Sequence, residues 1–238
     1  MKIRLFTIPN MLTLANLVSG AIAVIATLQY HNYTIAMGLV VLAALFDFLD
    51  GFVARLLNQQ SPLGVQLDSL ADDVTFGLVP ALVMFDMYNH SSSYFGCDCE
   101  VMGYMGYLTL IIAAFSVLRL AKFNIDTTQT TEFSGLPTPA NALLLLAVAM
   151  LNQRGYIAIS QEHILLLSVT MALLLISPIR MFALKFKGFG WKGNELRYIF
   201  ILVSALVVIV APIYSVAIII TLYIVVSTLK WLFAKEVK

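Results

Sequence analysis

Five of the chain's acidic residues lie within a stretch of 27 positions: Asp47, Asp50, Asp68, Asp72 and Asp73. Asp47 and Asp50 are three residues apart and Asp68 and Asp72 are four apart, so each pair projects from one face of a helix. Carboxylate oxygens without nearby nitrogen or sulfur ligands suit Mg²⁺ or Mn²⁺ rather than zinc. Two such ions can stabilise the attacking and leaving oxygens of a phosphoryl displacement. The first four aspartates therefore predict a divalent-metal site.

An alternative is that these aspartates cap helices or pair with basic side chains such as Arg55, Arg119 and Lys122. Asp73 projects about 100° away from Asp72 on a helix, which favours pairing or solvent exposure for Asp73. An isolated aspartate at the centre of a membrane costs about 2.5–3.5 kcal/mol, so a group of four needs cations or water.

Small residues accompany the first pair of aspartates. Gly51 and Ala54 leave room for a flat ligand beside the helix, and Arg55 can grip a diphosphate through its planar fork. Close packing of two helices through Gly51 and Ala54 is the alternative.

The composition places these residues in a membrane protein. Of the 238 residues, 61% are hydrophobic and 27 are charged, where a soluble protein of this length carries roughly 60 charged residues. The mean hydropathy is +0.92. These values exclude an ordinary soluble enzyme and a disordered chain, and a net charge of +1 argues against nucleic-acid binding.

Apolar runs long enough to cross a bilayer predict an all-α, polytopic helix bundle with about eight transmembrane helices. Pro212 divides the last run into two because proline breaks helices. The predicted spans are residues 11–29, 33–54, 69–88, 103–123, 140–152 with its flanks, 164–182, 198–211 and 212–232.

The basic residues orient this bundle. With both termini cytoplasmic, the cytoplasmic segments hold 13 of the 14 lysines and arginines, and Arg154 is the exception. The aspartates then lie at the cytoplasmic face. We expect one membrane-embedded domain over residues 1–238, with a core of residues 1–183 and two additional C-terminal helices within 196–232. Cys97 and Cys99 are one residue apart, and no catalytic role is expected for them.

The pattern of aspartates and small residues resembles the signature of the CDP-alcohol phosphatidyltransferases at every position. Segments 67–77, 119–124 and 134–140 are similar to the phosphatidylserine synthase branch of that family. The matching pattern is Asp47-x2-Asp50-Gly51-x2-Ala54-Arg55-x8-Gly64-x3-Asp68-x3-Asp72.

The resemblance implies a reaction in which a CDP-lipid, CDP-diacylglycerol, loses CMP when the hydroxyl of L-serine attacks. Asp47, Asp50, Asp68 and Asp72 would hold two divalent cations, Mg²⁺ or Mn²⁺, and Asp72 would also be the general base. The resemblance also implies a fold with six helices around the site, a location in the cell (inner) membrane and a homodimer. Residues implied around the CDP-lipid are Asn10, Thr13, Gly51, Ala54, Arg55, Ser61 and Gly64.

Several alternatives stay open. Asn10 and Thr13 also fit ordinary helix capping. Arg119, Lys122 and Asn124 either hold the lipid phosphate or serine carboxylate, or anchor the membrane edge. The acceptor could be another alcohol, such as glycerol phosphate or an inositol phosphate, and the donor an ether-lipid CDP compound. A cation channel or transporter is the alternative from another class.

Overall fold

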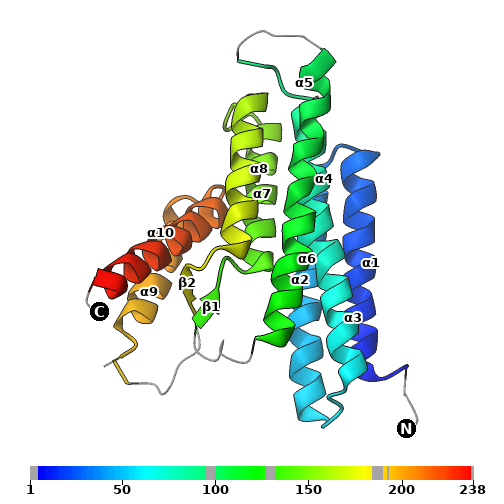
Figure 1. Cartoon of the computed structure of the whole chain (residues 1–238), viewed down its shortest axis with the longest axis vertical. Coiled ribbons are helices and arrows are strands. Elements are labelled where there is room, and N and C mark those ends of the chain that lie inside the picture. The colour runs from blue at the N-terminus through cyan, green and yellow to red at the C-terminus, as the bar shows by residue number, and fades with distance from the viewer. Residues whose placement is uncertain (1–4, 95–99, 127–131, 184–189, 192, 237–238) are drawn as a thin grey trace.

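The chain folds into helices with one small sheet. The structure, a computed structural model, describes residues 5–94, 100–126, 132–183, 190–191 and 193–236 (Figure 1). In chain order the elements are α1 (Ile8–Leu28), α2 (Tyr33–Leu56), α3 (Pro62–Asp72), η1 (Asp73–Leu78), α4 (Val79–Asn89), α5 (Glu100–Met105), η2 (Gly106–Leu110), α6 (Ile111–Ile125), β1 (Glu132–Ser134), α7 (Thr138–Gln153), α8 (Gln161–Ile176), β2 (Arg180–Phe182), α9 (Glu195–Val210) and α10 (Ser215–Glu236).

These elements form eight helical rods in the described part of the chain, because α3, η1 and α4 follow one another directly, as do α5, η2 and α6. Four helical stretches are long and apolar enough to cross a membrane, and α7 and α8 are shorter apolar helices. The predicted all-α, polytopic membrane architecture is confirmed, and the chain is an integral membrane protein. The four long stretches are Ile8–Leu28, Tyr33–Leu56, Gly103–Ile125 and Ser215–Phe233.

The rods α1 to α8 form the main bundle, and α9 and α10 lie to one side of it (Figure 1). Its core is built mainly from small and aliphatic side chains on α2, α4, α7 and α8, together with Tyr33, Phe76 and Tyr88, and α10 packs against α7 and β2. Many large apolar side chains on the outer helix faces are exposed, as expected where lipid replaces water.

The third rod begins earlier than the apolar pattern predicts. A start at residue 69 is wrong, because α3 begins at Pro62, and the proline is tolerated in the first helical turn. Ser61 caps this helix, with its Oγ accepting a hydrogen bond from the Gly64 amide at 3.1 Å. Gly64, which precedes the predicted span, is therefore already helical, and Asp68 lies almost two turns inside α3.

The span predicted for residues 164–182 is also wrong at its end. Helix α8 stops at Ile176, and Ser177 is extended, as the residue before Pro178 tends to be. The apolar residues that follow form β2, which pairs antiparallel with β1 so that Phe133 lies opposite Met181. The periodicity of hydrophobic residues alone does not distinguish a short apolar strand from the end of a helix.

Several residues of the sequence argument lie outside the described residues. They include both cysteines and part of the basic set: Lys2, Arg4, Cys97, Cys99, Lys185, Lys187, Lys192 and Lys238.

Candidate active site

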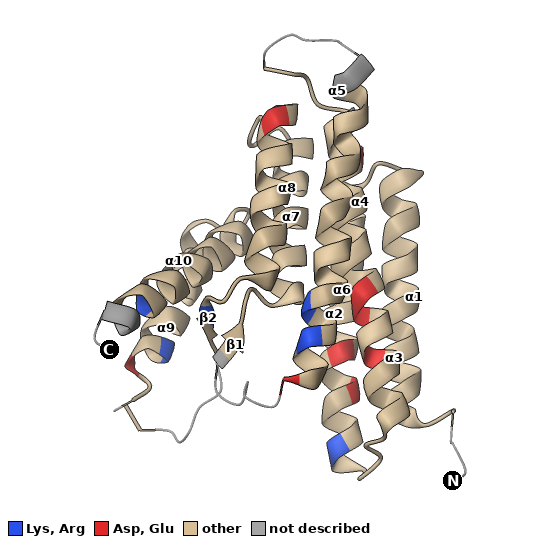
Figure 2. Ribbon diagram, in the orientation of Figure 1, with Lys and Arg blue, Asp and Glu red and all other residues tan. Residues whose placement is uncertain are grey.

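Three carboxylates meet where α2 and α3 lie beside each other. Asp47 and Asp50 come from the second half of α2 and Asp68 from α3, and one oxygen of each lies within 4.8 Å of the others. Figure 2 shows acidic and basic residues gathered over the lower halves of α2, α3 and α6. The helical spacing in the sequence predicts this convergence, and the structure brings these three together.

Asp72 lies one turn beyond Asp68 on α3 and is buried, with 9% of its surface exposed. It interacts electrostatically with Asp47 and Asp68, although its carboxylate is not part of the 4.8 Å group. Its Oδ1 accepts a hydrogen bond from Asn16 Nδ2 at 3.1 Å. Asp72 is therefore a neighbour of the three-carboxylate group, with its own partner on α1.

Helix α1 presents one polar face to these carboxylates. Thr13 donates from Oγ1 to Asp50 Oδ2 at 2.5 Å, and Asn16 binds Asp72 one turn later. Asn10, Thr13 and Asn16 recur at intervals of three, so they share a side of the helix. Sequence reasoning missed Asn16. The signal was present, because Asn16 is a polar residue in an apolar span one turn after Thr13.

The charges of the group are not balanced by protein cations. Within the described part of the chain, no lysine or arginine forms an ion pair with Asp47, Asp50 or Asp68. Asp68 Oδ1 is buried and has no hydrogen-bond partner. Two negative charges within 4.8 Å of each other repel by on the order of 3 kcal/mol at a protein-like dielectric constant. Hard oxygen ligands with a free lone pair fit a divalent cation of the Mg²⁺ class.

A cavity of about 520 Å³ opens beside Asp50 and Asp68, between the start of α1 and the turn that joins α2 to α3. All seven residues expected around a CDP-lipid line it. The lining consists of Pro9, Asn10, Thr13, Asp50, Gly51, Ala54, Arg55, Gln59, Gln60, Ser61, Pro62, Gly64, Val65 and Asp68.

Gly51 lines this cavity at a place where no side chain fills the space. A Cβ built at Gly51 would meet no protein atom nearer than Arg55 Nη1, at 3.6 Å. Packing between helices therefore does not require glycine here, which argues against the packing alternative for Gly51. The missing side chain leaves space in the cavity that Asp50 and Arg55 also line.

The profile of the family described as CDP-alcohol phosphatidyltransferase matches residues 6–179. The chain belongs to the CDP-alcohol phosphatidyltransferase family. The matched region runs from the cavity-lining start of α1 to just beyond α8, so the family region contains all the carboxylates and the whole cavity. Helices α9 and α10 lie outside it.

Relatives extend the similarity to nearly the whole chain. A CDP-diacylglycerol–serine O-phosphatidyltransferase of Helicobacter pylori is 30% identical over 233 residues, which cover 96% of this chain and 92% of that protein. The enzyme of the same name from Methanocaldococcus jannaschii is 30% identical over 74% of each chain. That from Bacillus subtilis is 34% identical over 60% of this chain and 75% of its own. As a member of this family, the chain is a transferase.

None of the three polar residues predicted at the end of α6 lines the cavity, although Arg119 interacts electrostatically with Asp72. Arg119 is buried, donates to Thr138 Oγ1 at 3.2 Å and lies over the Phe123 ring at 5.4 Å. Lys122 donates to Ser134 Oγ at 3.2 Å, and Asn124 to Ser69 Oγ at 2.7 Å. These last two contacts join α6 to β1 and α3. Binding of phosphate or serine by the three predicted residues stays a prediction.

Asp73 faces a different neighbour. A Cβ at Gly77 would lie 2.6 Å from Asp73 Oδ1 and 2.8 Å from Ser116 Oγ, so Asp73 points along η1 toward α6. This direction agrees with the angular argument that separates Asp73 from the other four aspartates.

Proposed function

We propose that this protein transfers the phosphatidyl group of CDP-diacylglycerol to the hydroxyl of L-serine and releases CMP. The observation that carries the proposal is that one cavity is lined by Asp50 and Asp68 together with Arg55 and Gly51, where no side chain fills the space. The names of relatives from two bacteria and an archaeon support serine as the acceptor.

The cavity residues would bind the CDP moiety. The Arg55 fork suits the diphosphate, and Asn10, Thr13, Ser61 and Gly64 line the same space. Two Mg²⁺ or Mn²⁺ ions, held by Asp47, Asp50, Asp68 and Asp72, would supply neutralisation of the diphosphate charge and of the departing phosphate. Asp72, one turn from Asp68 on α3, would join the three-carboxylate group in holding these ions.

Asp72 is the proposed general base. The serine oxygen forms a bond to the phosphorus that carries the diacylglycerol, while Asp72 takes the hydroxyl proton. The bond from that phosphorus to the bridging oxygen breaks, and its electron pair leaves with CMP. Asn16 fixes one carboxylate oxygen of Asp72, so the other oxygen remains to accept the proton.

The same proposal places the site at the cytoplasmic face of the cell membrane, with both termini inside. Basic residues near the aspartate end of the bundle, including Arg55 and Arg119, support this orientation, and Arg154 lies just beyond the opposite end of α7. The proposal keeps one domain over residues 1–238, with residues 1–183 as the core and the helices of 196–232 as an addition, and a homodimer as the assembly.

Release of CMP from CDP-diacylglycerol tests the proposal, measured on the purified full chain with one alcohol at a time. We expect release with L-serine, dependent on Mg²⁺ or Mn²⁺, and none with glycerol phosphate or an inositol phosphate. Release with one of those alcohols instead would replace serine as the acceptor. No release with any alcohol, combined with cation flux through reconstituted vesicles, would favour the channel alternative.

A further inference from the structure

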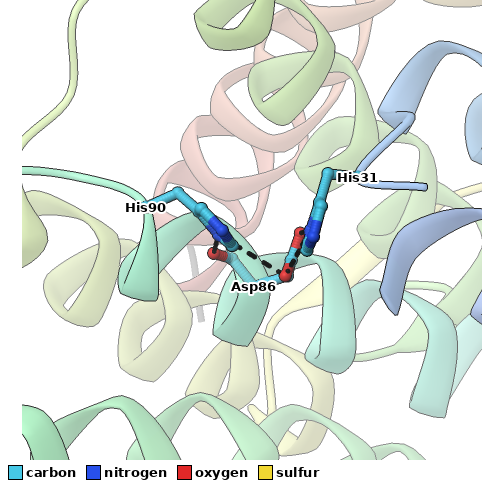
Figure 3. A group of neighbouring side chains, drawn as sticks. All are labelled: His31, Asp86 and His90. Atoms are coloured by element: carbon cyan, nitrogen blue, oxygen red, sulfur yellow. Dashed lines mark hydrogen bonds and ion pairs between the residues drawn. The ribbon is translucent and has the colours of Figure 1, made fainter. Parts of the chain in front are cut away.

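Two histidines and an aspartate meet at the other end of the bundle (Figure 3). His31 lies in the turn between α1 and α2, and Asp86 and His90 lie one turn apart at the end of α4. We call these three residues the His–Asp–His cluster. Along α2, the turn that holds His31 is about 25 Å from Asp50 at 1.5 Å per residue. The cluster is therefore separate from the aspartate site.

The spacing within the His–Asp–His cluster suits shared coordination. His31 Nδ1 is 3.0 Å from both carboxylate oxygens of Asp86. His90 Nδ1 is 3.5 Å from Asp86 Oδ1 and donates to the Asp86 backbone carbonyl oxygen at 2.8 Å, which leaves Nε2 of His90 as the ring nitrogen for an ion, as is common in metal-bound histidines. One ligand atom from each residue lies within 4.8 Å of the others. Ligands about 2.0–2.1 Å from a tetrahedral ion are separated by roughly 3.3 Å. The distance between His31 and Asp86 is close to that value, and no pair of ligand atoms in the cluster exceeds it by more than about 1.5 Å.

The carboxylate is held in place, whereas the imidazoles face water. Tyr33 donates from its hydroxyl to Asp86 Oδ2 at 2.9 Å. The Asp86 side chain is 7% exposed, and those of His31 and His90 are 50% and 56% exposed. A cavity of about 300 Å³ adjoins the cluster and gives an ion a route from water. Its lining is His31, Tyr33, Met87, His90, Ser91, Asn152 and Gln153.

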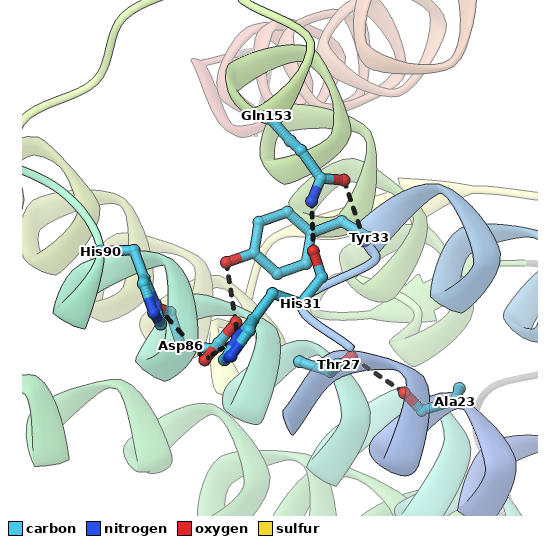
Figure 4. A network of polar contacts seen from close by, with 7 residues as sticks. All are labelled: Ala23, Thr27, His31, Tyr33, Asp86, His90 and Gln153. Atoms are coloured by element: carbon cyan, nitrogen blue, oxygen red, sulfur yellow. Dashed lines mark hydrogen bonds and ion pairs between the residues drawn. The ribbon is translucent and has the colours of Figure 1, made fainter. Parts of the chain in front are cut away.

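The turn that carries His31 is fixed on both sides (Figure 4). Gln153, at the end of α7, donates from Nε2 to the His31 carbonyl and accepts from the Tyr33 amide at 3.1 Å. The His31 amide donates to Thr27 O at 3.0 Å. His31 has φ +47°, a left-handed conformation that favours glycine. Histidine is present here although the backbone conformation favours glycine, and its ring contacts Asp86. Both observations point to a role for the imidazole.

We propose that His31, Asp86 and His90 bind one divalent transition-metal ion of the zinc class, with water completing its coordination. Two imidazoles and a carboxylate prefer such ions to Mg²⁺, which prefers oxygen ligands alone. The ion would join the α1–α2 turn to the end of α4. Helix α1 carries Thr13 and Asn16, and the rod that ends in α4 carries Asp68 and Asp72, so the ion would fix the relative position of two of the three rods that contribute to the aspartate site.

Zinc binding to the purified full chain tests this inference. The chain should carry a tag without histidine, be stripped with a chelator and be titrated with Zn²⁺ against a chromogenic chelator in excess Mg²⁺. We expect one tight site per chain, weakened at least tenfold in His90→Gln and in His31→Asn. Asparagine tolerates the left-handed conformation of residue 31. The chain has three histidines, so His163→Gln is the matched control and should bind as the wild type does.

Thermal unfolding provides a second measurement. Zn²⁺ should raise the midpoint temperature of the wild type and of His163→Gln but not that of His90→Gln, because a ligand that binds the folded state stabilises it. Equal zinc affinity in His90→Gln and the wild type would overturn the inference, and so would a wild type that takes up no zinc. If neither cluster variant folds, pulsed EPR of Cu²⁺ added to the wild type tests whether the two histidines bind the same ion. Coupling to two imidazole nitrogens supports the site, and its absence overturns it. Neither result depends on the proposed transferase activity.

Discussion

Asn16 on α1 donates a hydrogen bond from Nδ2 to Oδ1 of Asp72 on α3, at 3.1 Å and with both side chains buried. This contact joins two helices whose interacting residues are 56 positions apart in sequence. A buried carboxylate with one defined donor has a restricted orientation, because turning it away would leave the amide of Asn16 without a partner. The orientation of the proposed general base is therefore set by α1.

Replacing Asn16 by alanine should reduce catalysis while leaving substrate binding intact. We expect kcat for CMP release to fall about 10–100-fold, as for other groups that orient a functional side chain, with KM for CDP-diacylglycerol within about twofold of the wild type. Ser19→Ala is the control, because the Ser19 hydroxyl bonds only to Ala15 of its own helix in the described structure. An unchanged kcat in Asn16→Ala would remove Asn16 from this role.

Replacing Gly51 by alanine should weaken binding of the CDP-lipid without destabilising the fold. The new methyl group would enter the cavity without a clash, since the Arg55 guanidinium, at 3.6 Å, would be in ordinary van der Waals contact with it. We expect a higher KM together with an unfolding midpoint equal to or above that of the wild type, because alanine favours helices by about 1 kcal/mol over glycine. Steady-state kinetics and thermal unfolding in detergent measure both effects.

Gly38 provides the control on the same helix. A Cβ at Gly38 meets nothing within 4 Å, and Gly38 lies outside the cavity lining. Gly38→Ala should therefore show the same gain in stability with an unchanged KM. If Gly51→Ala also left KM unchanged, the CDP moiety would not lie against this wall.

Two glycines with positive φ should respond differently to alanine. Gly135 has φ +79°, and a Cβ there would lie 2.2 Å from the Leu175 carbonyl oxygen. Gly155 has φ +72° with nothing within 4 Å, so Gly155→Ala should cost only the conformational strain of about 1–2 kcal/mol. Gly135→Ala should lower the unfolding midpoint clearly further, because β1 must move away from the end of α8. Equal midpoints for the two variants would contradict this close approach.

Asp68 and Asp73 should differ sharply when each is changed to asparagine. Asp68 belongs to the three-carboxylate group, whereas Asp73 points toward Gly77 and Ser116. We expect Asp68→Asn to reduce CMP release by more than 100-fold, and to raise the Mg²⁺ concentration needed for half-maximal activity if residual activity is measurable. Asp73→Asn should keep activity within a few fold and the same Mg²⁺ dependence. A similar loss in both variants would argue for a general requirement for negative charge rather than a defined metal site.

Much of this arrangement could be predicted from local pattern. Apolar runs indicate the eight rods, and the spacing of Asp47, Asp50 and Asp68 puts them on facing helices. Contacts between residues far apart in the sequence could not be predicted from local pattern. Asn16 meets Asp72 only after α1 packs against α3, and His31 is 55 positions from Asp86. The end of α8 was misplaced because hydropathy does not register the effect of Pro178 on the backbone.

The central claim is that the aspartates at one end of the bundle share divalent cations. The most direct measurement is anomalous diffraction from crystals of the full chain grown with Mn²⁺ and a CDP-lipid. The account predicts manganese peaks within coordination distance of Asp47, Asp50 and Asp68, with the diphosphate in the adjoining cavity. Carboxylates that stay within reach of one another but show no manganese between them, in crystals that contain the bound CDP-lipid, would contradict it.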